Sequence, residues 1–186
     1  EFTFFIRKVP GGKFTEWLFG SNRDMSQQVT VNGPFGSFYL REKQSPIVCI
    51  AGGSGLAPIK ALLEGGVLDQ VKRDVVFLFG ARTQEDLYCV KEIKELKDKW
   101  NKDYKFDFIP VLNMEPEDSD WKGGRGLVTD YFENEIIKKD NLDVSDWQGY
   151  LCGPPPMIDA ACVVLEKHGI KSDEIFYDKF TDSRDL

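Results

Sequence analysis

From residue 46 onward, the chain alternates short β-rich runs with helical patterns. The runs are rich in Val, Ile, Phe and Tyr, and the stretches between them repeat apolar residues with a helical period. This alternation is typical of βαβ units, which build a parallel sheet covered by helices. We predict strands over residues 46–52, 74–80, 104–112, 149–153 and 174–180, and helices over about 57–64, 86–100, 127–138 and 155–168.

The stretch NMEPEDSDWKGGRG, residues 113–126, is polar, acidic and rich in turn residues. It follows the third predicted strand directly. We therefore predict a surface loop at the carboxyl end of that strand, which is the edge where open α/β sheets bind ligands.

Residues 1–45 have a different pattern. The runs FTFFIRKV, QVTVNG and SFYLR alternate like antiparallel strands and are linked by PGGKFTEWL and GPFG. This segment is too short to close a β-barrel by itself. We therefore predict two domains, with residues 1–45 as the last part of a barrel and residues 46–186 as an α/β domain, in a piece of a longer polypeptide.

Charge and cysteine content narrow the possible functions. The net charge of −7 argues against a nucleic-acid partner, because such a partner needs a basic surface. No apolar run approaches the roughly 20 residues that cross a bilayer. The four cysteines form no CxxC pair and His168 is the single histidine, so we expect reduced thiols, no metal site and a cytoplasmic location.

A run of small residues follows the first predicted strand within CIAGGSGLAPIKALLE, residues 49–64, and Pro58 then opens a helix. The run consists of Gly52, Gly53, Ser54 and Gly55. Glycines permit positive φ and let backbone N–H groups approach a ligand, and a helix N-terminus favours an anion such as a pyrophosphate. A turn built only for close packing has the same pattern. The usual dinucleotide fingerprint also needs an acidic residue at the end of the second strand, whereas Asp74 opens that strand, so the turn alone leaves both interpretations open.

The second signal is YLCGPPPMIDAA, residues 150–161, where the fourth predicted strand ends at Cys152 and Gly153 before a proline-rich turn. Taken alone, this pattern favours a rigid turn with a small buried thiol. However, the turn is predicted at the same edge of the sheet as the glycine turn. Two strand-end turns that converge near the topological switch of the sheet favour a ligand site.

Five motifs together resemble those of the ferredoxin-NADP reductase superfamily. In chain order they are GPFGSFYL, AGGSGLAPIKALL, FGARTQEDLY, YLCGPPPMIDAA and EIFYDKF. Within it, the chain is similar to the NADH-dependent reductase components of multicomponent monooxygenases of the methane, phenol and alkene type. The resemblance implies a five-stranded, parallel, doubly wound NAD-binding domain over residues 46–186. It also implies that residues 1–45 are the C-terminal part of an antiparallel FAD-binding β-barrel.

The resemblance implies roles for both turns. Gly52 through Pro58 would carry the NAD pyrophosphate, with Ser54 approaching the nicotinamide. Cys152 would lie near the reacting carbon as a positioning residue rather than a nucleophile, because hydride transfer to a flavin needs no acid or base from the protein. The implied NAD-binding residues are Gly52, Gly53, Ser54, Gly55, Pro58, Ala81, Arg82, Asp86, Cys152, Gly153, Pro154 and Met157.

The resemblance also implies flavin contacts. The superfamily places an aromatic residue near its C-terminal end against the flavin ring, and YDKF puts Phe180 there; anchoring an edge strand is the other interpretation, and Tyr177 is the second candidate. PGGKFTEWL resembles the segment that holds the flavin phosphates, which implies Gly11, Gly12, Lys13, Phe14 and Thr15. Thr15 is also predicted to cap a helix. The Arg-x-Tyr-Ser strand motif of the family is not in these residues, so we expect FAD to bind the parent protein rather than this fragment alone.

Arg82 bears on the choice of nucleotide. A guanidinium suits the 2′-phosphate of NADPH. Glu85 and Asp86 follow at once and would repel a dianion, so we expect NADH, with Arg82 at the adenosine ribose or on the surface.

The function implied is electron transfer, in which a hydride passes from NADH to FAD and single electrons then pass through a 2Fe-2S centre outside this fragment to an oxygenase hydroxylase component. Ser54, Cys152 and Phe180 would lie at the reacting groups. One alternative is a flavoprotein like the F subunit of sodium-translocating NADH:quinone reductase, to which the resemblance is weaker. The other is a non-catalytic nucleotide-binding module, although such a module is expected to lose the motifs GGSGLAP and CGPPPM, and both are present.

Overall fold

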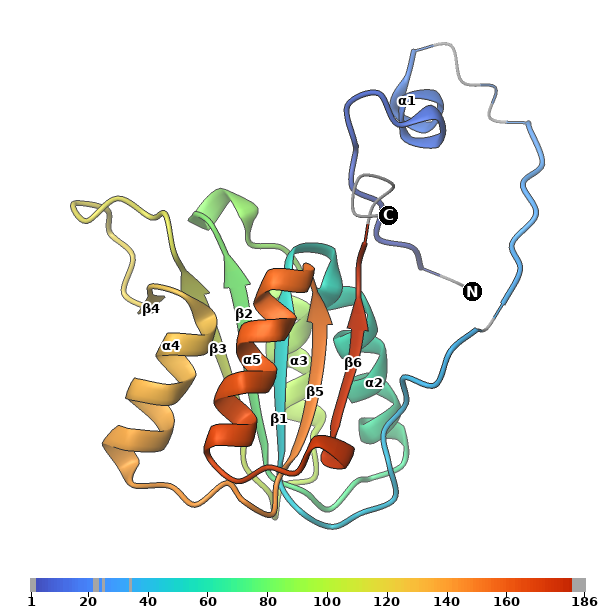
Figure 1. Ribbon diagram of the computed structural model, residues 1–186. Coiled ribbons are helices and arrows are strands. Elements are labelled where there is room, and N and C mark those ends of the chain that lie inside the picture. The colour runs from blue at the N-terminus through green and yellow to red at the C-terminus, as the bar shows by residue number, and fades with distance from the viewer. Residues whose placement is uncertain (1–2, 22–23, 25, 34, 182–186) are drawn as a thin grey trace. The chain divides into compact units, whose positions relative to one another are not determined.

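The computed structural model describes residues 3–21, 24, 26–33 and 35–181 (Figure 1). The chain divides into two compact units, Glu1–Ser37 and Phe38–Leu186. The second unit is an α/β domain, as predicted.

The second unit is built on a six-stranded sheet in which every pair of neighbouring strands is parallel. The strand order is β4-β3-β2-β1-β5-β6. The chain therefore adds β2, β3 and β4 on one side of β1 and then β5 and β6 on its other side, so the topological switch lies between β1 and β5. The strands are β1 (Ile47–Gly52), β2 (Val75–Ala81), β3 (Phe106–Leu112), β4 (Gly124–Arg125), β5 (Gln148–Gly153) and β6 (Ile175–Lys179). The doubly wound parallel sheet is therefore confirmed.

The prediction of five strands missed β4, which lies at the end of the acidic loop. Its two residues pair with Val111 and Leu112 of β3. Two residues are too few to produce a periodic pattern in the sequence. The strand forms because the loop folds back, with the Arg125 side chain donating hydrogen bonds to the carbonyl oxygens of Glu115 and Pro116.

Four helices cover the sheet of the second unit. They are α2 (Leu56–Leu68), α3 (Val90–Lys99), α4 (Val128–Tyr131), which continues as a π-helix over Phe132–Lys138, and α5 (Pro155–Lys167). The helix predicted over 86–100 begins four residues late. A 3-10 turn over Gln84–Asp86 and the left-handed Cys89, with φ 53°, interrupt the helical geometry there.

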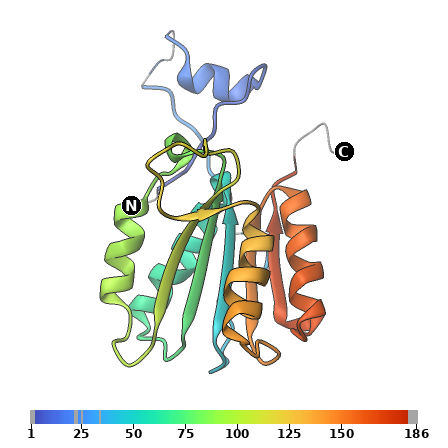
Figure 2. The same cartoon turned by 90° about the vertical axis from the view of Figure 1, so that its left-hand side faces the viewer.

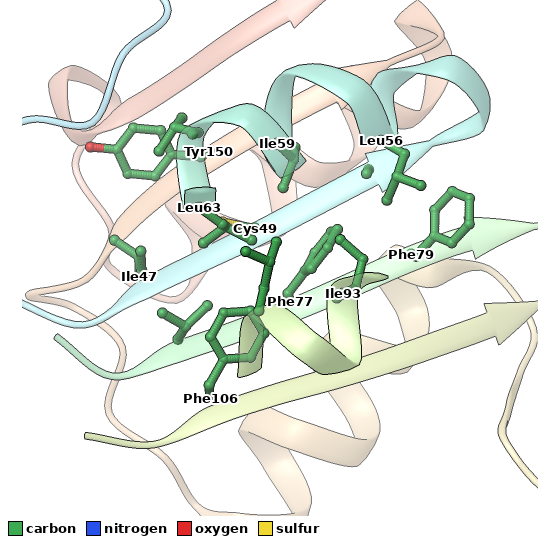
Figure 3. Close-up of a cluster of buried hydrophobic side chains, with 14 of the residues drawn as sticks. Ile47, Cys49, Leu56, Ile59, Leu63, Phe77, Phe79, Ile93, Phe106 and Tyr150 are labelled. Atoms are coloured by element: carbon green, nitrogen blue, oxygen red, sulfur yellow. The ribbon is translucent and has the colours of Figure 1, made fainter. Parts of the chain in front are cut away.

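The helices form one layer on each face of the sheet, as the two views show (Figures 1 and 2). Alternate residues of β1 point to opposite faces: Ile47 and Cys49 pack with α2 and α3, and Val48 and Ile50 pack with α4 and α5. Figure 3 shows the first of these cores, where side chains of α2 and α3 meet those of the strands. All six residues of β1 are buried, as expected for a central parallel strand.

The first unit differs from the prediction. Its regular element is α1 (Lys13–Phe19), and the described residues between 3 and 46 contain no strand. The strands predicted over FTFFIRKV, QVTVNG and SFYLR are therefore wrong for the described residues. Phe2 of the first run and Pro34 of the linking GPFG lie outside those residues. Strand-like runs need neighbours for their backbone hydrogen bonds, and these runs do not pair with one another. The assignment of residues 1–45 to a barrel stays a prediction.

Within the described ranges, no helix combines the length and apolar character needed to cross a membrane.

Candidate functional site

The two turns predicted to converge do lie side by side. β1 and β5 are adjacent and parallel, with Ala51 opposite Cys152, so both strands end at the same edge of the sheet. A 3-10 turn over Gly53–Gly55 leads from β1 into α2, and Pro154 leads from β5 into α5. The chain reverses across the sheet between these two strands, which is the position where open α/β sheets bind ligands.

Three glycines allow the two turns to touch. A Cβ atom on Gly55 would lie 2.1 Å from the carbonyl oxygen of Cys152, and one on Gly153 would lie 2.9 Å from that of Gly52. A Cβ atom on Gly52 would lie 2.6 Å from the Met157 sulfur. Close packing therefore requires glycine at Gly55 and Gly153, where the nearby atoms are backbone, whereas the Met157 side chain could move away from a Cβ on Gly52. For Gly55 and Gly153, the interpretation as a turn built for close packing applies.

Gly53 is different, because no atom lies within 4 Å of where its Cβ would be, and its residue is exposed. It has φ 54°, a conformation that glycine adopts easily. Beside it, Ser54 is partly exposed, and both belong to the 3-10 turn that leads into the thirteen-residue α2, with Pro58 in the first turn of that helix. The turn thus presents open backbone at the start of a helix, as an anion site requires.

A hydrogen bond from Tyr88, which lies outside the turn, holds Gly53 in place. The Tyr88 hydroxyl donates a 2.7 Å hydrogen bond to the carbonyl oxygen of Gly53, and its ring packs edge-on against Phe79 at a centroid distance of 5.6 Å. Burial raises the pKa of the Tyr88 hydroxyl to about 12, so it stays a donor at neutral pH. Tyr88 is the last residue of the motif FGARTQEDLY, but the motif did not predict its contact with Gly53, which lies 35 positions away.

We predict that Tyr88→Phe weakens NADH binding about three- to tenfold and lowers the free energy of unfolding by about 1 kcal/mol, because the Gly53 carbonyl loses its donor. NADH fluorescence titration and urea unfolding measure the two effects. Tyr104→Phe is the matched control, since Tyr104 precedes β3 at the opposite edge of the sheet and should leave NADH affinity unchanged. Equal NADH affinity for Tyr88→Phe and wild type would show that the hydrogen bond does not position the turn.

Cys152 lies at the end of β5 and is completely buried in the core shared with α2 and α3. Burial raises the pKa of its thiol to about 12, so it is protonated at neutral pH. A buried neutral thiol packs as a small apolar group and is a poor nucleophile. The four cysteines are unpaired, and the described part of the chain holds no group of three or more His, Cys, Asp or Glu side chains that could bind a metal ion.

Phe180 lies directly after β6, at the same edge as the two turns. Its backbone N–H donates to the carbonyl oxygen of Gly153 at 2.9 Å, and the residue is 39% exposed. Tyr177 is more exposed and contacts the Lys179 ammonium, which lies 5.1 Å from its ring centroid. The hydrogen bond to Gly153 attaches Phe180, rather than Tyr177, to the CGPP turn.

Ala81, Arg82 and Asp86 lie at the carboxyl end of β2, next to β1 in the sheet. Arg82 is exposed and faces Asp86, with its nitrogens 3.4 Å from the two carboxylate oxygens. Asp86 also accepts from the Thr83 N–H at 3.3 Å. These residues form a third group at the ligand edge, on the side away from β5.

The segment that includes Gly11 to Thr15 lies in the first unit. Gly11 has φ 74° and its N–H donates to the Glu16 carboxylate at 2.8 Å. Lys13 and Phe14 are exposed at the start of α1. The predicted cap at Thr15 is wrong: Gly12 precedes the helix, and the Thr15 hydroxyl instead accepts from the N–H of Val9 at 3.1 Å. Val9–Gly12 form a turn in which the Gly12 N–H donates to the Val9 carbonyl at 3.0 Å, and Thr15 lies in the first turn of the helix that follows.

Comparisons with known proteins agree with this geometry. Residues 49–163 match the family model described as the oxidoreductase NAD-binding domain. The chain is 46% identical over 178 residues to the xylene/toluene monooxygenase electron transfer component XylA of Pseudomonas putida, covering 96% of this chain and 48% of that protein. It is 38% identical over 183 residues to the propane 2-monooxygenase reductase component of Mycolicibacterium smegmatis, covering 97% and 51%. The chain therefore spans about half the length of the curated relatives it matches.

Solved structures give the same result. The crystal structure of the Amycolatopsis cytochrome P450 reductase GcoB superimposes with a TM-score of 0.76 at 30% identity, over 95% of this chain and 51% of that one. The ferredoxin reductase in carbazole 1,9a-dioxygenase superimposes with a TM-score of 0.72 at 27% identity, over 95% and 50%.

Proposed function

Because the chain belongs to the oxidoreductase NAD-binding domain family of the ferredoxin-NADP reductase type, we propose that it is the NADH-binding part of a reductase that supplies electrons to an oxygenase. The observation that carries the proposal is the contact between the Gly53–Gly55 turn and the turn after β5 at the switch point of the sheet. The two turns come from segments about 100 residues apart and meet only in the fold.

The residues at the ligand edge fit a dinucleotide. Gly53 and Ser54 present accessible backbone at the start of α2, whereas Gly52 and Gly55 are committed to packing. In our proposal, the exposed part of this turn binds the pyrophosphate, with Pro58 in the first helical turn below it. Tyr88 keeps the Gly53 carbonyl turned away from the anion by holding it in a hydrogen bond.

The proposed nicotinamide end lies toward β5. In our proposal, the nicotinamide lies against Cys152, Gly153, Pro154 and Met157, at the end of β5 and the start of α5, and Ser54 approaches it from the glycine turn. NADH, when bound, supplies the hydride, and the chain's own task is alignment and exclusion of water, since none of these side chains is a base at neutral pH. The neutral, buried Cys152 thiol is proposed to set the position of the turn after β5.

We further propose that Phe180 lies against the flavin ring of the parent protein, and that Gly11 to Thr15 lie near the flavin phosphates. The hydrogen bond from Phe180 to the Gly153 carbonyl supports the first assignment, because it attaches the aromatic residue to the turn beside the proposed nicotinamide site. The electron acceptors proposed are a 2Fe-2S domain and an oxygenase hydroxylase component, by analogy with the oxygenase systems named for the relatives. The unpaired cysteines support a cytoplasmic location.

Titration of the 186-residue chain with NADH tests the proposal. We expect saturable binding in the micromolar range, followed by NADH fluorescence, with one nucleotide per chain. A parallel titration with FAD, followed by flavin absorbance, is expected to show no binding at micromolar concentrations. Failure of the folded chain to bind NADH would contradict the proposed function, and micromolar FAD binding would contradict the assignment of the flavin site to the parent protein.

A further inference from the structure

The acidic loop 113–126 is attached to the carboxyl end of β2. The Asn113 N–H donates to the Ala81 carbonyl at 3.1 Å and the Met114 N–H to the Arg82 carbonyl at 2.8 Å, so the loop continues the β3–β2 pairing beyond the strands. Farther along, the Arg125 guanidinium closes the loop on itself through Glu115, Pro116 and Ser119. The start of the loop is therefore held beside Arg82, and Arg125 fixes the shape of the rest.

Glu115 makes the central contact between this loop and the turn after β2. Its two carboxylate oxygens accept from the backbone N–H of Gln84 at 2.9 Å and from the Gln84 side-chain amide at 2.7 Å. The same amide also donates to Asp120 at 3.1 Å. The hydrogen bonds from Gln84 lower the pKa of the Glu115 carboxyl, so it is ionised at neutral pH.

The backbone N–H of the residue before Gln84 also donates to a carboxylate. Asp86 accepts from the Thr83 N–H and contacts the Arg82 guanidinium at 3.4 Å. The backbone N–H groups of residues 83 and 84 thus both donate to carboxylates of the chain itself, and the guanidinium beside them faces one of these carboxylates. A 2′-phosphate brought to this turn would meet two fixed negative charges in place of donors.

We propose that Glu115 is a specificity-determining residue, which excludes nucleotides with a 2′-phosphate by fixing a carboxylate on Gln84 at the end of β2. This inference rests on the proposed function, since it assigns the adenosine ribose of the dinucleotide to this turn. The ligand class selected is the dinucleotide with a free 2′-hydroxyl. The charge that selects against the 2′-phosphate comes from a loop more than 30 residues away from Gln84 in sequence. It acts in addition to the charges of the local acidic residues Glu85 and Asp86.

The test compares NADH and NADPH affinities of wild type and Glu115→Gln, measured by fluorescence titration at low and high salt. Glu115→Gln keeps an acceptor for Gln84 and removes the charge. We expect the ratio of the NADPH to the NADH dissociation constant to fall about fivefold or more, with the NADH constant changed less than twofold, and the effect to shrink at high salt. Competition by 2′,5′-ADP against 5′-ADP should show the same shift, since these fragments carry only the adenosine end.

Glu117→Gln is the matched control, because it removes the same charge from an exposed position of the same loop. The inference predicts a smaller shift for Glu117→Gln than for Glu115→Gln. An unchanged ratio in Glu115→Gln, or an equal shift in both variants, overturns the role of Glu115 while NADH binding by wild type still supports the proposed function. A folded wild-type chain that binds neither nucleotide overturns the proposed function and this inference with it.

Discussion

Gly55→Ala is expected to destabilise the protein by about 3 to 5 kcal/mol and to abolish NADH binding at micromolar concentrations. The added Cβ would lie 2.1 Å from the Cys152 carbonyl oxygen, 2.4 Å from its carbon and 2.7 Å from the Gly153 nitrogen. All three are backbone atoms of β5 and its turn, so no side-chain rotation relieves the clash. The two turns must separate, and the proposed site between them is lost.

Urea unfolding followed by tryptophan fluorescence measures the stability, because Trp100 and Trp147 are buried in the native state. Gly65→Ala is the matched control within α2: nothing lies within 4 Å of its added Cβ, so it should stabilise the helix by about 0.5 to 1 kcal/mol. A stable Gly55→Ala variant that binds NADH normally would contradict the packing of the two turns described above.

Arg73→Met is expected to lower the free energy of unfolding by about 3 kcal/mol. Arg73 is 2% exposed at the amino edge of the sheet. Its guanidinium donates to the Ser45 carbonyl, to the Arg41 carbonyl at 3.3 Å and to the Gln148 side chain at 2.8 Å. A methionine fills a similar volume and leaves these buried acceptors without that donor.

The hydrogen bonds continue beyond Arg73 and hold the segment that enters β1. The Gln148 amide donates to Glu174, which also pairs with Lys43 at 2.8 Å, and the Arg41 N–H donates to the Tyr150 hydroxyl at 2.9 Å. We therefore expect trypsin to cleave Arg73→Met after Arg41 or Lys43 faster than it cleaves the wild type.

Lys72→Met is the control for Arg73→Met, because it removes the same charge one residue earlier from an exposed side chain. It should change the free energy of unfolding by less than about 0.5 kcal/mol. Equal stability of the two variants, or unchanged cleavage in Arg73→Met, would show that the buried guanidinium does not hold this segment.

The elements from residue 46 onward were predictable because each carries its own periodic signal. All five predicted strands are present within two residues of the expected limits, since β-branched and aromatic runs bounded by turns are local features. The start of α3 was missed, because a local capping box between Thr83 and Asp86 forms a separate 3-10 turn over Gln84–Asp86, and Cys89 then takes a left-handed conformation before the helix begins. The strands predicted before residue 46 failed for a different reason: strand formation needs a pairing partner, which periodicity does not supply.

The candidate site was partly predictable for the same physical reason. The glycine and CGPP turns can be recognised in the sequence, because glycine allows positive φ and close approach of other atoms, and proline fixes the backbone. The contacts that hold the glycine turn and the turn after β2 were not predictable in this way. Tyr88 contacts Gly53 and Glu115 contacts Gln84, across 35 and 31 residues of sequence. No local pattern specifies which distant residue such a side chain meets.

The parallel α/β architecture and the place of the two turns at one edge of the sheet follow from the amino-acid sequence, because hydrophobic periodicity and the backbone preferences of glycine and proline act locally. The folded structure was needed to distinguish the glycines that pack closely, Gly52 and Gly55, from Gly53, which has open space around it. It also brought Tyr88 and Glu115 to the ligand edge and buried Arg73 at the opposite one. These assignments depend on distances between segments far apart in the chain, which arise only when the sheet order and register bring the segments together.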